Sequence, residues 1–154
     1  MRAGEGRFRD PRVWLYSLAA EDIDVVCPRC SARAVVTTRP VEGLRVLSWP
    51  RRFVCTACVS TASWPSADPS SCWGGPEDPF FRFRLWRTAE LRSGRILWAF
   101  NAAHLTLLED FVGARLRERG PAAGHMTMIA RLPAWMKAAK NRDEVSRALA
   151  RMRA

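Results

Sequence analysis

The sequence is poor in the residues from which most hydrolytic active sites are built. It contains two histidines and one tyrosine among 154 residues, and only 15 residues are acidic. No nucleophile stands in a recognisable arrangement with a base, and Glu21-Asp22, Asp24 and Glu109-Asp110 have the spacing of surface turns and helix exteriors. Nucleophilic and acid–base catalysis need such groups within reach of one another. We therefore expect a protein that is not an enzyme.

Lysines and long apolar segments are also scarce. Lys137 and Lys140 are the only lysines, and neither follows a glycine-rich loop of the kind that cradles phosphates. No apolar run reaches the roughly 18 to 20 residues that span a bilayer, and none follows the N-terminal arginines as in a secretion signal. The five cysteines are an odd number with four in close pairs, so we expect a reducing, cytoplasmic location and no membrane insertion.

The chemistry that the sequence does contain is concentrated in four cysteines. Cys27 and Cys30 form one pair and Cys55 and Cys58 a second, with two residues between the members of each pair. This spacer lets one tight turn aim both sulfurs at a shared point, so two turns complete a tetrahedral cage. We predict one structural zinc ion there; an iron–sulfur centre and unmetallated cysteines are the alternatives. A closed cage leaves no coordination position for water, so the ion would stabilise the fold and not catalyse.

Three further residues of the metal-binding types have no assigned role. Cys72 is unpaired, and no neighbouring motif indicates a lowered pKa for its thiol. His104 shares a helix face with Leu108, which favours a partly buried histidine. No spacing joins Cys72, His104 and His125 into a second metal site.

The pattern of the chain predicts an α+β fold: a three-stranded zinc ribbon followed by a β-hairpin and two to three packed α-helices. Within the ribbon, residues 34–38 are predicted to form a strand, residues 40–43 a turn and residues 44–48 the returning strand. The predicted boundaries are an N-terminal arm or strand at 1–19, the ribbon at 20–64, a linker loop at 65–79, and the hairpin with its helices at 80–154.

The second half begins with a predicted strand in which Phe81, Phe83 and Leu85 alternate with arginines. This alternation is typical of a half-buried strand, with Arg82 and Arg84 on the wet face. We expect Arg87, at the end of the segment, to line that face as well. Residues 92–95 are predicted to turn the chain into a return strand at 96–100.

Helical periodicity follows the hairpin. Asn101 is the predicted N-cap of a helix that ends at Gly120-Pro121, and residues 127–132 are predicted to start a second helix. Asn141 is predicted to cap the last helix, with Glu144 three residues later completing a capping box. The apolar stripe of that helix comprises Val145, Ala148, Leu149 and Met152.

The chain is strongly basic, with a formal net charge of +10. A zinc ion held by four thiolates would lower this to about +8. Such a surface attracts polyanions through phosphate neutralisation and counterion release. Nearly all of the basic residues are arginines, so a GC-rich coding sequence also accounts for part of the charge.

Two groups of basic residues are the candidate nucleic-acid contacts, one in the ribbon around Trp49 and one in the C-terminal region. Residues 131–153 contain seven basic and two acidic side chains. Arginines interleaved with exposed aromatic rings suit phosphate contact and base stacking, although we expect most of the seven tryptophans to belong to the core. The candidates are Arg45, Arg51, Arg52, Lys137, Lys140, Arg147 and Arg151.

The Cys-Pro-Arg-Cys knuckle at 27–30 resembles that of the transcription-initiation-factor type of zinc ribbon. The insert between the pairs is longer than is usual there, and Ser31 and Val59 stand where glycine is common. The segments 85–88, 97–105 and 132–142 are similar to small bacterial zinc-ribbon proteins of unassigned function. The resemblance implies a metal site, and it implies that hairpin, helix and ribbon form one unit; it implies no activity.

We therefore predict a non-enzymatic zinc-ribbon protein that binds nucleic acid, either DNA or RNA, through arginine-rich surfaces. The alternative is a protein–protein adaptor, a subunit that docks its ribbon and exposed tryptophans on a larger complex. Salt separates the two, because phosphate binding weakens steeply as salt rises whereas a tryptophan-anchored interface barely changes.

Overall fold

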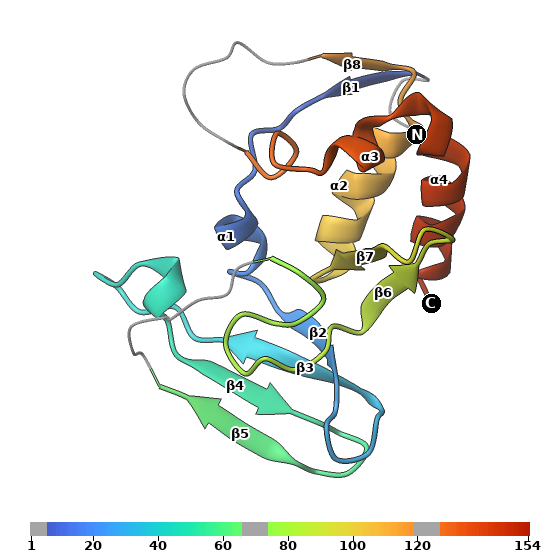
Figure 1. The fold of residues 1–154 in the computed structure, drawn as a ribbon. Helices are drawn as coiled ribbons and strands as arrows, with labels where there is room; N and C mark the ends of the chain where they lie inside the picture. The colour runs from blue at the N-terminus through green and yellow to red at the C-terminus, as the bar shows by residue number, and fades with distance from the viewer. Residues whose placement is uncertain (1–5, 66–73, 119–126) are drawn as a thin grey trace.

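The computed structural model describes residues 6–65, 74–118 and 127–154, and it has the predicted α+β fold (Figure 1). A four-stranded antiparallel sheet occupies one end of the molecule, and the helices lie at the other end. We call this sheet and its turns the ribbon. Its strands, in spatial order, are β2 (Ile23–Val26), β3 (Arg33–Thr38), β4 (Arg51–Val54) and β5 (Thr61–Trp64).

The ribbon has four strands and not three, and the predicted strand at 44–48 is wrong. Residues 39–50 instead make an excursion that contains a 3-10 turn, η1 (Val46–Ser48), and the chain rejoins the sheet only at Arg51. The Trp49 indole N–H holds this excursion closed by donating to the carbonyls of Val41 and Leu44 at 3.2 and 3.1 Å. Prolines at both ends of the excursion remove backbone donors that a strand would need.

The β-hairpin forms as predicted, but the strand expected before it is largely irregular. Strand β6 (Arg87–Glu90) pairs with β7 (Ile96–Ala99), and Gly94 supplies the positive φ of the turn. Upstream, only residues 84–86 align beside β2: Val26 N–H donates to Arg84 and Trp86 N–H donates to Asp24.

The aromatic residues before the hairpin pack on the inner face of the ribbon. The rings of Phe53 and Phe83 meet edge to face at a centroid distance of 5.0 Å, and Trp64 meets Phe80 at 4.9 Å. Asp78, fully buried, shapes this segment by accepting the backbone N–H groups of three residues: Phe80, Phe81 and Phe83. Residues 74–79 of the predicted linker therefore belong to a packed segment; residues 66–73 lie outside the described part of the chain.

Helix α2 (Ala102–Gly113) begins as predicted and ends earlier than predicted. The Asn101 side chain accepts the His104 N–H at its start. The helix stops at Gly113, and residues after it form β8 (Leu116–Glu118), which pairs in parallel with β1 (Arg7–Arg9). Arg117 reaches back to the carbonyls of Phe111 and Val112, so its guanidinium satisfies acceptors at the helix end.

The C-terminal helices cover α2. Helix α3 (Ala134–Lys137) leads through a 3-10 turn, η2 (Ala139–Asn141), into α4 (Arg142–Arg151), which packs against α2 and β6. The predicted apolar stripe of α4 is buried. A short helix α1 (Leu15–Leu18) precedes the ribbon.

Two other details of this region were predicted wrongly. The capping box does not form, because the Asn141 side chain donates to the Trp135 carbonyl and the Glu144 carboxylate accepts the Arg92 N–H of the hairpin. Residues 128–132 make a turn and no helix. In the capping box, the contact of Glu144 with the hairpin takes the carboxylate on which the local prediction relied.

Candidate metal centre and basic surfaces

Each cysteine pair lies in a turn that joins two neighbouring strands of the ribbon. The first turn follows β2 and the second follows β4. The turns have equivalent backbone hydrogen bonds: Cys27 N–H donates to Ala32, and Cys55 N–H donates to Ser60, at 2.8 and 2.9 Å. Two like turns on one sheet therefore present their sulfurs to a common point.

Both turns contain a residue in the left-handed region where glycine is usual. Ser31 has a φ of 63° and Val59 a φ of 61°. An L-residue pays roughly 1–2 kcal/mol for this conformation. Both turns therefore adopt the left-handed conformation although neither Ser31 nor Val59 favours it.

The sulfur atoms have the spacing of a tetrahedral metal site. Cys27 and Cys58 are 3.7 Å apart, Cys30 and Cys55 are 3.6 Å apart, and all four sulfurs lie within 4.8 Å of one another. A tetrahedron with metal–sulfur bonds of about 2.3 Å separates its sulfurs by about 3.8 Å, whereas a disulfide would bring them to about 2.05 Å. The four cysteines predicted from their spacing therefore form a group that can hold a metal ion.

The surroundings of Cys58 favour its thiolate, whereas desolvation and the neighbouring thiols raise the pKa of Cys30. The Ser60 hydroxyl lies 3.0 Å from the Cys58 sulfur. The hydroxyl and the backbone N–H of Ser60 lower the pKa of the Cys58 thiol to about 6. Cys27 and Cys55 are buried and Cys30 is exposed, so the site sits at the tip of the ribbon with one side toward solvent.

Among the candidate nucleic-acid contacts in the ribbon, Arg45 and Arg52 are exposed and Arg51 is not. Arg51 is 2% exposed; its guanidinium donates to the carbonyls of Ala19, Val46 and Trp49. It also lies 4.0 Å from the centre of the Phe80 ring. Burial lowers the pKa of Arg51 to about 10, against the opposing effect of the Asp78 carboxylate. Arg51 therefore joins the ribbon to its neighbours and is not part of an outer surface.

The candidates in the C-terminal helices form a separate surface. Lys140, Arg147 and Arg151 are exposed, whereas the Lys137 ammonium donates to the Ala130 carbonyl at 2.9 Å. Helices α3 and α4 lie at the opposite end of the molecule from β4 and β5 (Figure 1). The structure therefore divides the predicted basic residues between two surfaces.

Most of the described tryptophans pack within the molecule. Trp14 is 37% exposed, whereas the other described tryptophans are partly buried, at Trp49, Trp64, Trp86, Trp98 and Trp135. Trp73 lies outside the described residues. This distribution agrees with the expectation that most tryptophans are core.

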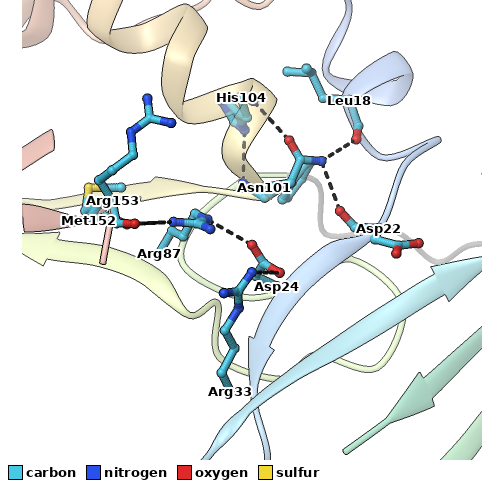
Figure 2. A network of polar contacts seen from close by, with 10 residues as sticks. Leu18, Asp22, Asp24, Arg33, Arg87, Asn101, His104, Met152 and Arg153 are labelled. Atoms are coloured by element: carbon cyan, nitrogen blue, oxygen red, sulfur yellow. Dashed lines mark hydrogen bonds and ion pairs between the residues drawn. The ribbon is translucent and has the colours of Figure 1, made fainter. Parts of the chain in front are cut away.

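A buried polar network joins the ribbon to the hairpin and helices (Figure 2). The Asp24 carboxylate pairs with Arg87 at 2.8 Å and with Arg33 at 3.0 Å. Arg87 also donates to the carbonyls of Met152 and Arg153 at the end of α4. Asp24 and Arg87 had been expected at the surface, and that expectation is wrong: they are 7% and 5% exposed. The position of Asp24 between two buried apolar residues of β2 was the signal available in the sequence.

Beside this network lies an open hollow of about 750 Å³. Its walls include Glu21 and Asp22, with Asp24, Arg33 and Arg87. The last three pair with one another, and the neighbouring Asn101 amide donates to the carbonyls of Leu18 and Asp22. Asp24, Arg33, Arg87 and Asn101 therefore already have partners within the fold.

His104 is fully buried, beyond the partial burial that was expected. It is 2% exposed, and its Nδ1 accepts the Phe100 N–H at 3.1 Å. Cys72 and His125 lie outside the described residues. Within residues 6–65, 74–118 and 127–154, the four cysteines are the only group of His, Cys, Asp and Glu side chains with metal-ligand geometry.

Over the same residues, none of the helices has the length and apolar character needed to cross a membrane. Comparison of the chain with protein-family models, with curated proteins and with solved structures finds no match.

Proposed function

We propose that this chain is a non-enzymatic zinc-ribbon protein of a reducing compartment that binds nucleic acid through the exposed arginines of its ribbon. The observation that carries the proposal is the coincidence of a four-sulfur cluster with a ribbon that carries several exposed arginines. The cluster holds the ribbon in shape, and the arginines provide the contacts.

Zinc is the ion that the donor set favours. Four sulfurs in a tetrahedron suit zinc or an iron–sulfur centre, and a four-cysteine cage is typical of structural zinc. Such a cage has no open position for a substrate, which supports a structural role. Elemental analysis of the purified protein should return one zinc per chain and no iron; iron with inorganic sulfide would contradict the assignment.

The ribbon has an unbalanced positive charge. Residues 27–64 contain six arginines and one acidic residue. Four of these arginines are exposed and have no ion pair within the described part of the chain: Arg29, Arg39, Arg45 and Arg52. Arg52 lies on β4 and Arg29 in the first cysteine turn, whereas Arg39 and Arg45 lie in the excursion at 39–50. Uncompensated guanidinium groups suit contact with phosphates.

The outer face of the sheet is suited to a polar backbone. Arg52 lies in register between Thr37 on β3 and Ser63 on β5. The Thr37 hydroxyl donates to the Arg52 carbonyl, which leaves the Ser63 hydroxyl and the Arg52 guanidinium as donors for a phosphate. Because the tryptophans are largely packed, we expect contacts to the phosphate backbone with little base stacking, and thus weak sequence preference.

The helical surface of Lys140, Arg147 and Arg151 is a second possible contact, and it permits a matched comparison. The double variant Arg45→Glu/Arg52→Glu changes the ribbon, and Arg147→Glu/Arg151→Glu changes α4 by the same number of charges. Fluorescence anisotropy with a labelled duplex DNA and an RNA of the same sequence would measure both variants over a range of salt.

We expect the ribbon variant to lose at least about tenfold in affinity, and its plot of log K against log salt to be less steep by about 2. The affinity of the α4 variant and the slope of its salt plot should change less. Zinc content and melting temperature of each variant serve as controls for folding. A loss confined to the α4 variant would move the contact to the helices, and binding that is insensitive to salt and to both variants would favour the adaptor alternative.

A further inference from the structure

A second, largely apolar cavity lies in the helical half, away from the cysteines. Its volume is about 350 Å³. The walls come from β7, α2, α3 and the turn at 128–132, and they include two indole rings and several aliphatic side chains: Trp98, Trp135, Leu97, Leu108, Met128 and Met136. An apolar cavity of about 150 Å³ already holds benzene, so this volume suits a bicyclic molecule.

One polar ring stands in this apolar wall. His104 lines the cavity, and its Nδ1 is occupied by the Phe100 N–H. Burial lowers the pKa of His104 to about 4, so the ring is neutral at pH 7. With Nδ1 accepting, the neutral ring has its proton on Nε2, and this N–H has no hydrogen-bond partner among the described residues.

Water is a poor partner for that donor. A retained buried water makes two to four hydrogen bonds, and the other side chains that line the interior of this cavity are chiefly apolar. An unpartnered N–H costs free energy when it is buried. A ligand with one acceptor atom would satisfy the donor, and its apolar remainder would fill the space.

We propose that this cavity binds a small, uncharged, planar apolar molecule that carries one hydrogen-bond acceptor, which accepts from the Nε2–H of His104. The indole rings of Trp98 and Trp135 in the wall favour an aromatic ring system. The exposed members of the lining mark the mouth: Tyr16, Gly74, Arg131 and Pro133. The site is independent of the proposed contact with nucleic acid.

Quinoline and naphthalene test the proposal because they share size and shape, and only quinoline has an acceptor atom. Binding of each to the zinc-loaded protein would be titrated by two-dimensional NMR of backbone and histidine ring nitrogens. We expect quinoline to bind about tenfold more tightly than naphthalene, with shifts at the Nε2 of His104.

Two variants and a control complete the experiment. His104→Asn keeps an acceptor near the Phe100 N–H and removes the Nε2–H, so the preference for quinoline should disappear. Leu132→Trp should fill the cavity and abolish both bindings, whereas Leu44→Trp, on the exposed loop of the ribbon, should change neither. Failure of quinoline to bind wild type, or an equal preference in His104→Asn, would overturn the proposal.

Discussion

At the scale of single residues, the two knuckles show how strongly the sulfur geometry dominates local preference. Val59 adopts a left-handed backbone although it is β-branched, and its side chain is 81% exposed. Exposure means that its side chain contributes little packing to offset the strain. The absence of glycine at Ser31 and Val59 was visible in the sequence, but the strained backbone follows only from the requirement that four sulfurs converge.

Val59→Gly should therefore stabilise the protein. Relief of the left-handed strain is partly offset by the greater freedom of glycine in the unfolded chain, so we expect the free energy of unfolding to rise by about 0.5–1 kcal/mol. Urea unfolding of the zinc-loaded protein measures this change in free energy. Val35→Gly, the same change on the extended backbone of β3, should lower stability. If Val59→Gly lowered the free energy of unfolding, the valine would make a stabilising contact and its backbone would not be strained.

The adjacent arginines of β4 show what alternation can predict at this scale. Phe53 is buried, so Arg51, two residues earlier, must share its inward face, while Arg52 points outward. Both residues are arginines, adjacent in the chain, and both were expected at the surface. Their different roles follow from strand phase, which the phenylalanine indicates.

At the scale of elements, local sequence signals predicted the ends of some helices and strands correctly and failed for others. The cysteine spacing, the hairpin turn and the Asn101 cap needed only neighbouring residues, and they were predicted correctly. The end of α2 and the excursion at 39–50 depend on distant partners. Arg117 caps α2 from within a strand that pairs with the N-terminal β1, and no local pattern contains that information.

Removal of one cluster ligand should unfold the ribbon as an element. Structural zinc contributes on the order of 10 kcal/mol to small folds, so Cys55→Ser should lose the metal and the ribbon structure together. Elemental analysis and limited proteolysis would record both. Cys72→Ser, which changes the cysteine outside the two pairs, is the matched control, and a protease-resistant, metal-free Cys55→Ser protein would contradict a metal-dependent ribbon.

At the scale of the whole molecule, the Asp24 network makes the ribbon and the helical half one folding unit (Figure 2). Asp24 belongs to β2, Arg87 to β6, and the carbonyls that Arg87 reaches lie at the end of α4. The sequence predicted both halves and their order. It did not reveal this junction, because its members are far apart in the chain.

Arg87→Met should destabilise the folded protein by about 3–5 kcal/mol, because it leaves a buried carboxylate short of a partner. Arg33→Met removes the other arginine, whose side chain is 52% exposed, and should cost less than about 1 kcal/mol. Denaturant unfolding followed by tryptophan fluorescence compares the two. Equal losses would show that the junction does not depend on the buried pair.

The contact of Arg87 with Met152 and Arg153 also orders events during biosynthesis. The ribosome releases residues 20–64 long before it releases residues 152 and 153. The ribbon can therefore bind a metal ion while the rest of the chain is still being synthesised. Arg87 can pair with Asp24 earlier, but its guanidinium reaches these two carbonyls only after the final turn of α4 has been synthesised. We therefore expect a nascent chain to mature in two stages, in which metal capture precedes closure of the junction.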